Sequence, residues 1–102
     1  MKNFSLAIAL IMMATVAVAG DAEAGKIKGY TCTGCHGIPG YNNVYPTYKV
    51  PKIGGQNYEY LVAALNAYKN NDRVHSTMNS QAMSLEQADI EDIAAYFASL
   101  SH

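Results

Sequence analysis

Cysteines and basic residues are scarce in this chain, and it has neither a clear strand pattern nor a long apolar run. It holds two cysteines, and its seven Lys and Arg residues stand against eight Asp and Glu, for a formal net charge of −1. No basic patch indicates a nucleic-acid partner. The longest apolar run, residues 4–19, is shorter than the roughly 20 residues of a membrane-spanning helix. These absences argue against a nucleic-acid-binding protein and against stable insertion in a membrane.

The N-terminus has the pattern of a secretory signal peptide. Lys2 supplies a positive charge, the apolar run follows, and Ala-Val-Ala at residues 17–19 forms a small-x-small cleavage site. A second site at residues 22–24 is disfavoured because it follows two charges. We therefore predict a signal peptide at residues 1–19, a single domain at residues 20–102 and a periplasmic location. A domain this small buries little surface and often needs a staple.

The two cysteines stand in the run Cys32-Thr-Gly-Cys35-His36, which has the C-x-x-C-H spacing of c-type haem attachment. Two thiols three residues apart can each bond one vinyl group of the same porphyrin, and the imidazole that follows is then placed under the iron. A thioredoxin-like pair would need a βαβ context, and a zinc site needs about four N or S ligands. A disulfide would not explain His36. We predict one covalently bound haem c, with His36 as an iron ligand.

The other face of the iron has several candidate ligands. They are Met78, Met83, His75 and His102. Met78 lies in a polar segment where a methionine has no obvious core face to fill, whereas Met83 abuts the last helix and could pack beneath it. A methionine ligand gives an electron-transfer haem and raises its potential. We favour Met78, with Met83, another ligand or an open position as the alternatives.

Three helices are predicted from capping residues and apolar spacing. The first covers residues 22–32 and the second residues 57–70. The third covers residues 85–100, with Ser84 and Gln87 as a capping box. Its expected buried stripe consists of Ile90, Ile93, Phe97 and Leu100.

Two segments are predicted to be irregular. Residues 34–56 contain four glycines and three prolines, which punctuate regular structure. A loop of this length is usually functional or wrapped around something, and a haem edge would satisfy that expectation. Residues 73–83 are polar and are also predicted to be irregular.

Several segments together carry a resemblance to a known family. They are residues 20–26 (GDAEAGK), 32–37 (CTGCHG), 51–56 (PKIGGQ) and 85–100, with Arg73-x-His75-x-x-Met78 between the last two. On these segments the chain resembles the class I c-type cytochromes, near the c4/c553 group of small bacterial carriers. The resemblance covers nearly all of residues 20–102. It implies an all-α cytochrome c fold, in which the N- and C-terminal helices cross near Tyr96 and Phe97 and loops wrap around one haem c.

The resemblance also implies roles for single residues. Met78 falls on the axial position of the family's distal loop. The carbonyl of Pro51 is expected to accept a hydrogen bond from Nδ1 of His36, which would fix the ring and make it more basic. Ile53 is expected to line the haem pocket. Cys32 and Cys35 take the two attachment positions, as in the C-x-x-C-H reading above.

Three features depart from the family pattern or extend it. Glu86 stands where the family usually has a serine cap, so the last helix could start at Ser84 instead. Residues 41–50 form a tyrosine-rich insertion, which could cover a haem edge, bind the propionates or only pad the surface. Arg73 could pair with a propionate or remain solvated.

We expect a periplasmic electron-transfer protein that carries one electron through a His/Met-ligated haem and is not an enzyme. Its partners would be redox proteins that dock briefly. The first alternative is a haem subunit bound tightly to a periplasmic dehydrogenase, with the tyrosine-rich insertion as the interface. The second is a ligand-binding or peroxidatic haem, which requires an open or labile sixth position.

Overall fold

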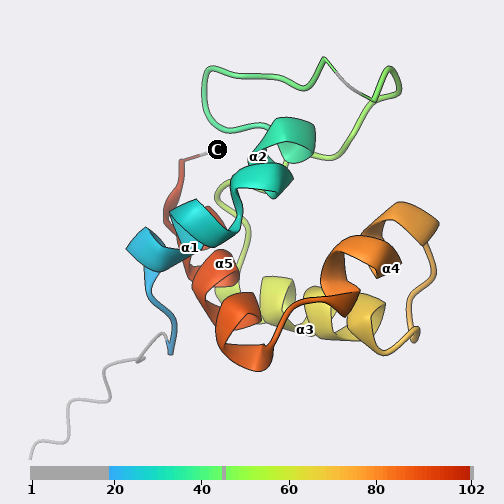
Figure 1. Cartoon of the computed structure of the whole chain (residues 1–102). Helices are drawn as coiled ribbons and strands as arrows, with labels where there is room; N and C mark the ends of the chain where they lie inside the picture. The colour runs from blue at the N-terminus through green and yellow to red at the C-terminus, as the bar shows by residue number, and fades with distance from the viewer. Residues whose placement is uncertain (1–18, 45, 102) are drawn as a thin grey trace, which may run out of the picture.

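The computed structural model describes residues 19–44 and 46–101. Within these ranges the chain forms five α-helices and a single isolated bridge, with no longer strand (Figure 1): α1 Ala22–Lys28, α2 Tyr30–His36, α3 Tyr58–Lys69, α4 Ser76–Met83 and α5 Gln87–Ser99. The prediction of an all-α fold is confirmed. None of these helices is long and apolar enough to cross a membrane. The predicted signal peptide lies outside the described residues, apart from Ala19.

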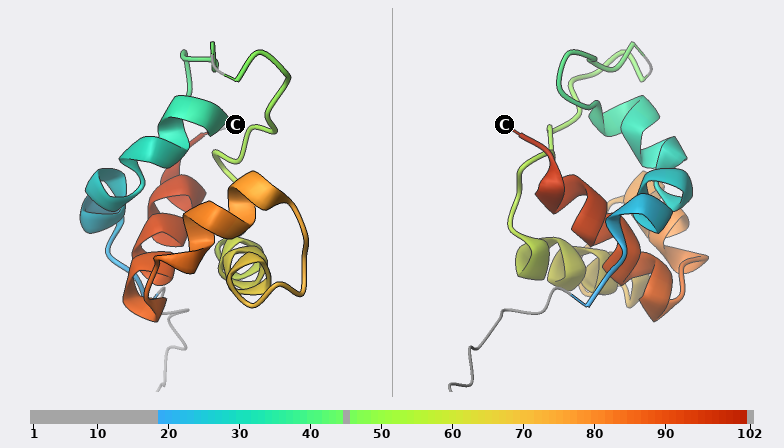
Figure 2. Two further views of the ribbon diagram at one scale, coloured as in Figure 1. Left: turned by 45° about the vertical axis from the view of Figure 1, so that its right-hand side comes forward. Right: turned by 90° about the vertical axis from the view of Figure 1, so that its left-hand side faces the viewer.

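The first and last helices cross at a contact that only glycine permits. A Cβ atom on Gly25 would lie 1.9 Å from the backbone oxygen of Asp92 in α5, so no residue with a side chain fits there. Tyr96 and Phe97 are buried beside this contact and pack edge to face. The crossing of α1 and α5 therefore confirms the topology that the resemblance implied (Figures 1 and 2).

The prediction of one helix over residues 22–32 is wrong, and the predicted loop over residues 34–56 begins only at Gly37. α1 ends at Lys28, the chain turns at Gly29, and α2 continues to His36 before Gly37 ends it with a φ of 76°. Gly34 does not break α2, because a single glycine within a helix costs only about 1 kcal/mol.

α5 supplies most of the core. Ile90, Ile93 and Phe97 are buried as predicted, and Leu61 and Leu65 of α3 pack against them. Leu100, the last residue of the predicted stripe, is half-buried at the edge of this cluster.

α5 begins later than predicted. The capping box consists of Glu86 and Asp89, and the side chain of each accepts the backbone N–H of the other. Ser84 cannot take this role because it ends the preceding helix as its C-cap. The expectation that the helix would start at Ser84 is therefore wrong.

α3 forms as predicted. At the start of the helix, Oδ1 of Asn57 accepts a hydrogen bond from the Tyr60 N–H at 2.9 Å. At its end Asn71 has a φ of 61°, and the Asp72 and Asn71 N–H groups donate back to the Ala67 and Tyr68 carbonyls. This arrangement is a Schellman motif.

The prediction that residues 73–83 are irregular is wrong, because eight of them form α4. The side chain of His75 caps this helix by accepting the Met78 N–H at 3.5 Å. Ala82 is its one buried residue. A polar helix that buries so little has no apolar stripe for sequence reasoning to detect.

Among the described helices, the backbone of α2 lies close only to α1 and that of α4 only to α3, although Cys32 and Met78 reach the core with their side chains. α5 contacts both α1 and α3 and so joins the two pairs. Two views of the chain show α2 and α4 as separate arms above this base (Figure 2). The functional site lies between the arms.

Candidate functional site

The C-x-x-C-H run forms the last five of the seven residues of α2. Cys32 and His36 are one helical turn apart and therefore share a face of the helix. Cys32 and Cys35 are half-buried and are not joined by a disulfide. Burial raises the pKa of the Cys32 thiol, whereas a reactive thiol needs a lowered pKa. These features fit attachment sites better than a redox-active thiol pair.

The ring of His36 is held from behind by the Pro51 segment. Its Nδ1 lies 2.6 Å from the carbonyl oxygen of Pro51, and because a carbonyl can only accept, Nδ1 is the donor. This is the hydrogen bond that the resemblance implied. It fixes the tautomer in which Nε2 has a free lone pair, as an iron ligand requires.

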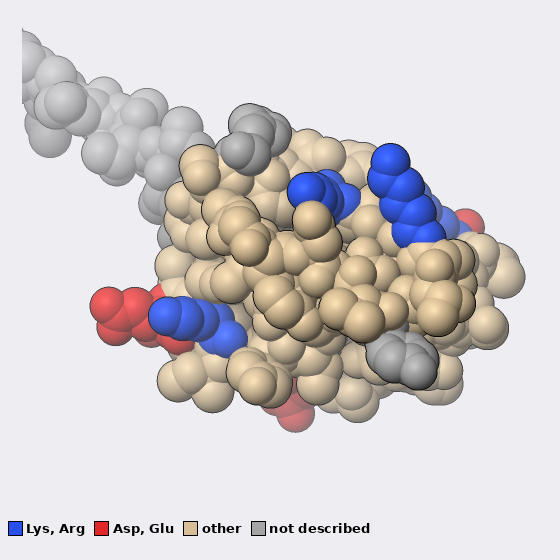
Figure 3. Space-filling model, turned by 90° about the horizontal axis from the view of Figure 1, so that it is seen from above, with Lys and Arg blue, Asp and Glu red and all other residues tan. Residues whose placement is uncertain are grey.

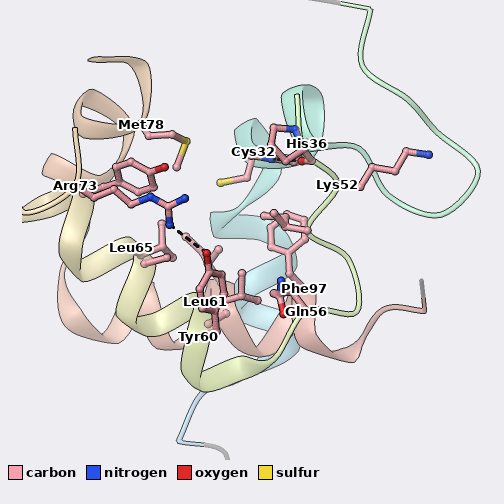
Figure 4. Close-up of a pocket in the computed structure, with 16 residues that line it drawn as sticks. Cys32, His36, Lys52, Gln56, Tyr60, Leu61, Leu65, Arg73, Met78 and Phe97 are labelled. Carbon is pink, nitrogen blue, oxygen red and sulfur yellow. Dashed lines mark hydrogen bonds between the residues drawn. The ribbon is translucent and has the colours of Figure 1, made fainter. Parts of the chain in front are cut away.

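Met78 faces this site from the opposite arm. It is half-buried against the hydrophobic core, and in the close-up its side chain and that of Cys32 point toward the same space (Figure 4). Met83 is 63% exposed, and its side chain lines neither of the cavities described below. His75 lies at the rim as the cap of α4, and His102 is outside the described residues.

Two adjoining cavities of about 190 and 470 Å³ separate the arms. Cys32, His36, Pro51 and Met78 line both of them. The larger one also reaches Cys35, and the smaller one is walled by Ile53, Leu61, Leu65 and Phe97. The larger volume lies in the range of cofactor pockets, which are mostly apolar with a few convergent polar groups.

The donor set of this space matches haem c. Two thiols stand on one side, and an imidazole and a thioether face each other across an apolar gap, which are the groups that attach and ligate a c-type haem. No cluster of three or more His, Cys, Asp or Glu side chains that could hold a bare metal ion occurs among residues 19–44 and 46–101.

Sequence reasoning missed the polar rim of the smaller cavity. Nη1 of Arg73 donates to the Tyr60 hydroxyl at 3.2 Å, and the guanidinium lies 4.9 Å from the centroid of the Tyr68 ring (Figure 4). The sequence indicates Arg73 as a candidate, but it shows Tyr60 and Tyr68 only as residues of a predicted helix. Their spacing of eight residues, about two turns of α3, was the available signal.

The tyrosine-rich insertion forms an extended loop beside α2. Tyr48 and Val50 line the larger cavity, so this end of the loop walls the site. Tyr41 and Val44 are exposed, and Tyr45 lies outside the described residues. The expectation that the loop covers the edge of the site therefore fits Tyr48 and Val50 but not Tyr41.

Comparisons with known proteins agree with this geometry. The family model described as cytochrome c matches residues 22–101. Cytochrome c4 of Pseudomonas aeruginosa is 38% identical over 95 residues, which cover 93% of this chain and 46% of that protein. Cytochrome c-554(548) of Halomonas halodenitrificans is 40% identical over 84 residues, which cover 79% of this chain and 98% of that protein. A sulfide dehydrogenase cytochrome subunit of Chlorobaculum tepidum is 35% identical over 77 residues, or 76% of this chain and 66% of that subunit.

This chain thus spans about half the length of the Pseudomonas cytochrome c4 and nearly the whole of the Halomonas protein. The family match, the C-x-x-C-H run and the crossed terminal helices all indicate the same protein family. The chain belongs to the cytochrome c family, as a class I c-type cytochrome of the c4 group that carries covalently bound haem c.

Proposed function

We propose that this protein is a periplasmic electron carrier that passes single electrons between redox proteins. The observation that carries the proposal is the placement of His36 and Met78, which face one apolar cavity from opposite arms of the fold. Haem c supplies the one-electron iron couple. A protein that keeps both axial ligands through the transfer rearranges little, which suits a carrier better than a catalyst.

Each residue at the site has a distinct task in this proposal. Cys32 and Cys35 anchor the haem through thioethers, and His36 ligates the iron from the same helix. The hydrogen bond to Pro51 holds the imidazole in orientation and increases its basicity. Met78 would supply a second iron ligand, and a thioether ligand would raise the reduction potential relative to a nitrogen ligand.

The cavity walls and rim set the surroundings of the haem. Buried side chains of α3 and α5 keep the dielectric around the ring low, which also tunes the potential. Arg73 and Tyr60 stand at the rim as the groups that would hold a propionate. Arg73 is suited to this because a guanidinium binds carboxylates through paired N–H groups.

We propose that the partner docks on the face formed by α2 and the loop of residues 38–50. Tyr30, Tyr41, Val44 and Tyr48 are exposed there, at 78%, 48%, 71% and 53%. Viewed from the loop side, the surface is mostly uncharged, with basic side chains on it and acidic ones only near its edge (Figure 3).

The charge of this face indicates the chemistry of the partner. No Asp or Glu occurs in α2 or the loop that follows it, where Lys49 lies, and Lys52 comes just after the loop. A redox protein with acidic groups around an apolar contact would complement it. Such complementarity speeds association more than it strengthens binding, which favours brief encounters.

The tightly bound dehydrogenase subunit is the less favoured alternative. Cytochrome c4 of Pseudomonas aeruginosa matches 93% of this chain, against 76% for the relative named as a sulfide dehydrogenase subunit. A peroxidatic haem would need an open sixth position, and the placement of Met78 argues against one.

The proposed ligation predicts a spectroscopic signature. The oxidised holoprotein should show the methionine–iron band near the red end of the visible spectrum. Met78→Ala should lose that band and lower the reduction potential, because the thioether ligand is removed. The matched control is Met83→Ala, which removes an exposed thioether from the same helix and should leave both unchanged. Retention of the band in Met78→Ala with loss in Met83→Ala would overturn the assignment.

A further inference from the structure

The arm that carries Met78 is weakly anchored by apolar contacts. α4 contacts only α3 among the described helices, and Ala82 is its one buried residue. Met78 and Leu85 add partly buried contacts to the core. A short helix with so little burial needs polar contacts to stay in place, because isolated helices of this length are unstable in water.

Asn79, the neighbour of Met78, supplies three such contacts. Its Nδ2 donates to the carbonyl oxygens of Tyr68 at 2.8 Å and Arg73 at 2.9 Å. Its Oδ1 accepts the backbone N–H of His75 at 2.9 Å. The half-buried amide thus uses both of its donors and its acceptor on backbone groups.

These three backbone groups lie where the fold changes direction. Tyr68 belongs to the last turn of α3, Arg73 to the connecting loop, and His75 to the cap of α4. One side chain therefore ties the end of one helix, the loop and the start of the next. At the far end of α4, the Lys69 ammonium donates to the Leu85 carbonyl, so α3 also holds the turn that follows α4.

We propose that Asn79 is a positioning residue that holds the Met78 arm closed over the iron. The proposal rests on the ligation by Met78 proposed above. Adjacent residues of a helix point about 100° apart, so Met78 can face the cavity while Asn79 faces α3 and the loop. Asn79 does not touch the haem site, since it lines neither cavity.

The amide group suits this position in a way that its isosteric acid does not. A carboxylate at residue 79 could still accept from the His75 N–H but would lack the donors that Asn79 gives to two carbonyl oxygens. It would also place a negative charge against those oxygens. Removal of the amide leaves three backbone groups to find other partners, and net losses of this kind are about 1 kcal/mol per hydrogen bond.

Competition with an added ligand measures how firmly the arm is closed. Imidazole can bind the ferric iron only after Met78 leaves, so its apparent affinity rises as the open state becomes more populated. We expect Asn79→Ala to bind imidazole at least about tenfold more tightly than the wild-type holoprotein, from hydrogen-bond losses of this size. Asn79→Asp should show an effect at least as large, and both variants should have lowered reduction potentials.

Asn66→Ala is the matched control. Asn66 is also half-buried and also donates to a backbone carbonyl, that of Val62 at 3.0 Å, but within α3 and away from both cavities. Imidazole affinity should change less than about twofold in this variant, even if the denaturation midpoint falls. Equal effects of the Asn79 and Asn66 substitutions would reduce the role of Asn79 to general stability and overturn the proposal.

Met78→Ala separates this proposal from the one on which it rests. A methionine–iron band that persists in Met78→Ala would overturn both. A band that is lost in Met78→Ala, together with wild-type imidazole affinity in Asn79→Ala, would overturn only the role of Asn79.

Discussion

At the scale of single residues, Asn71 has the least ordinary backbone among the described residues. It is the one non-glycine there with a positive φ, at 61°, and it forms the C′ position of the motif that ends α3. Asparagine tolerates this conformation better than other residues with a Cβ. The turn it makes sets the course of the chain toward Arg73 and α4.

Replacement of Asn71 should therefore affect stability according to backbone freedom. Asn71→Val should destabilise the protein by about 1–2 kcal/mol, because a β-branched residue is strained in the left-handed region. Asn71→Gly should be neutral or slightly stabilising. Denaturant midpoints of the holoprotein measure both. Equal stability of the valine and glycine variants would contradict the strain argument.

Individual residues of the site differ in how far sequence reveals them. The C-x-x-C-H spacing reveals Cys32, Cys35 and His36 because covalent haem attachment requires it. Met78 emerges from the polar character of its segment and from the family resemblance. Asn79 has no such pattern, because its partners are backbone groups brought together only by the turn after α3. A hydrogen bond to a backbone group does not depend on the partner's side chain, so the residue types in the sequence do not reveal it.

At the scale of elements, predictability follows the apolar stripe. α3 and α5 have buried residues at helical spacing and were predicted nearly to their ends. α4 is polar and was missed, since tertiary hydrogen bonds rather than an apolar face hold it. The break between α1 and α2 at Gly29 was missed because a single glycine is tolerated within a helical pattern.

The crossing of α1 and α5 carries an ion-pair cluster. Lys28 lies 2.6 Å from Asp92 and 3.0 Å from Asp89, and Asp92 also accepts the backbone N–H of Asp21 at 2.8 Å. The hydrogen bond from Lys28 lowers the pKa of Asp92. The backbone N–H of Glu86, followed by Lys28, lowers the pKa of Asp89.

These lowered pKa values predict acid sensitivity. A carboxyl group with a lowered folded-state pKa contributes stability above its unfolded pKa of 3.8, and that contribution is lost as the pH falls through the folded value. Midpoints of thermal unfolding should therefore fall as the pH drops from about 5. Lys28→Met should flatten this dependence, and 1 M salt should weaken it because Lys28 is exposed and the two carboxylates are only partly buried.

Lys26→Met is the control for that experiment, because Lys26 is an exposed lysine on the same helix. Its acid profile should match that of the wild type. A profile of Lys28→Met as steep as the wild type would show that the acid sensitivity arises elsewhere.

At the scale of the whole molecule, the helix pairs α1–α2 and α3–α4 are joined through α5. Helices α1, α3 and α5 form the base of the fold, and α2 and α4 are its arms. α1 and α3 both pack on α5, and α3 and α5 supply the buried core, to which α2 and α4 add only the partly buried Cys32 and Met78. The arms α2 and α4 each have one helical neighbour. The space between them is therefore the part of the fold that depends most on the haem.

In the haem-free protein, helices α2 and α4 should unfold before α3 and α5. In a Cys32→Ser, Cys35→Ser variant, amide hydrogens of α2 and α4 should exchange rapidly, while those of α3 and α5 remain the most protected. The reason is that local opening is easiest where few apolar contacts are lost. Exchange measured by mass spectrometry after peptide digestion gives the pattern. Uniform protection across all five helices would contradict the division into arms and base.

The lack of contact between α2 and α4 also bears on how such a protein is assembled. Since α4 touches neither α1 nor α2, it can swing away without disturbing the α1–α5 crossing. A porphyrin can then reach the thiols of α2 from the side that α4 will later cover. Attachment and closure would then be separate events in time, with the covalent bonds to Cys32 and Cys35 made first and the proposed coordination by Met78 formed last.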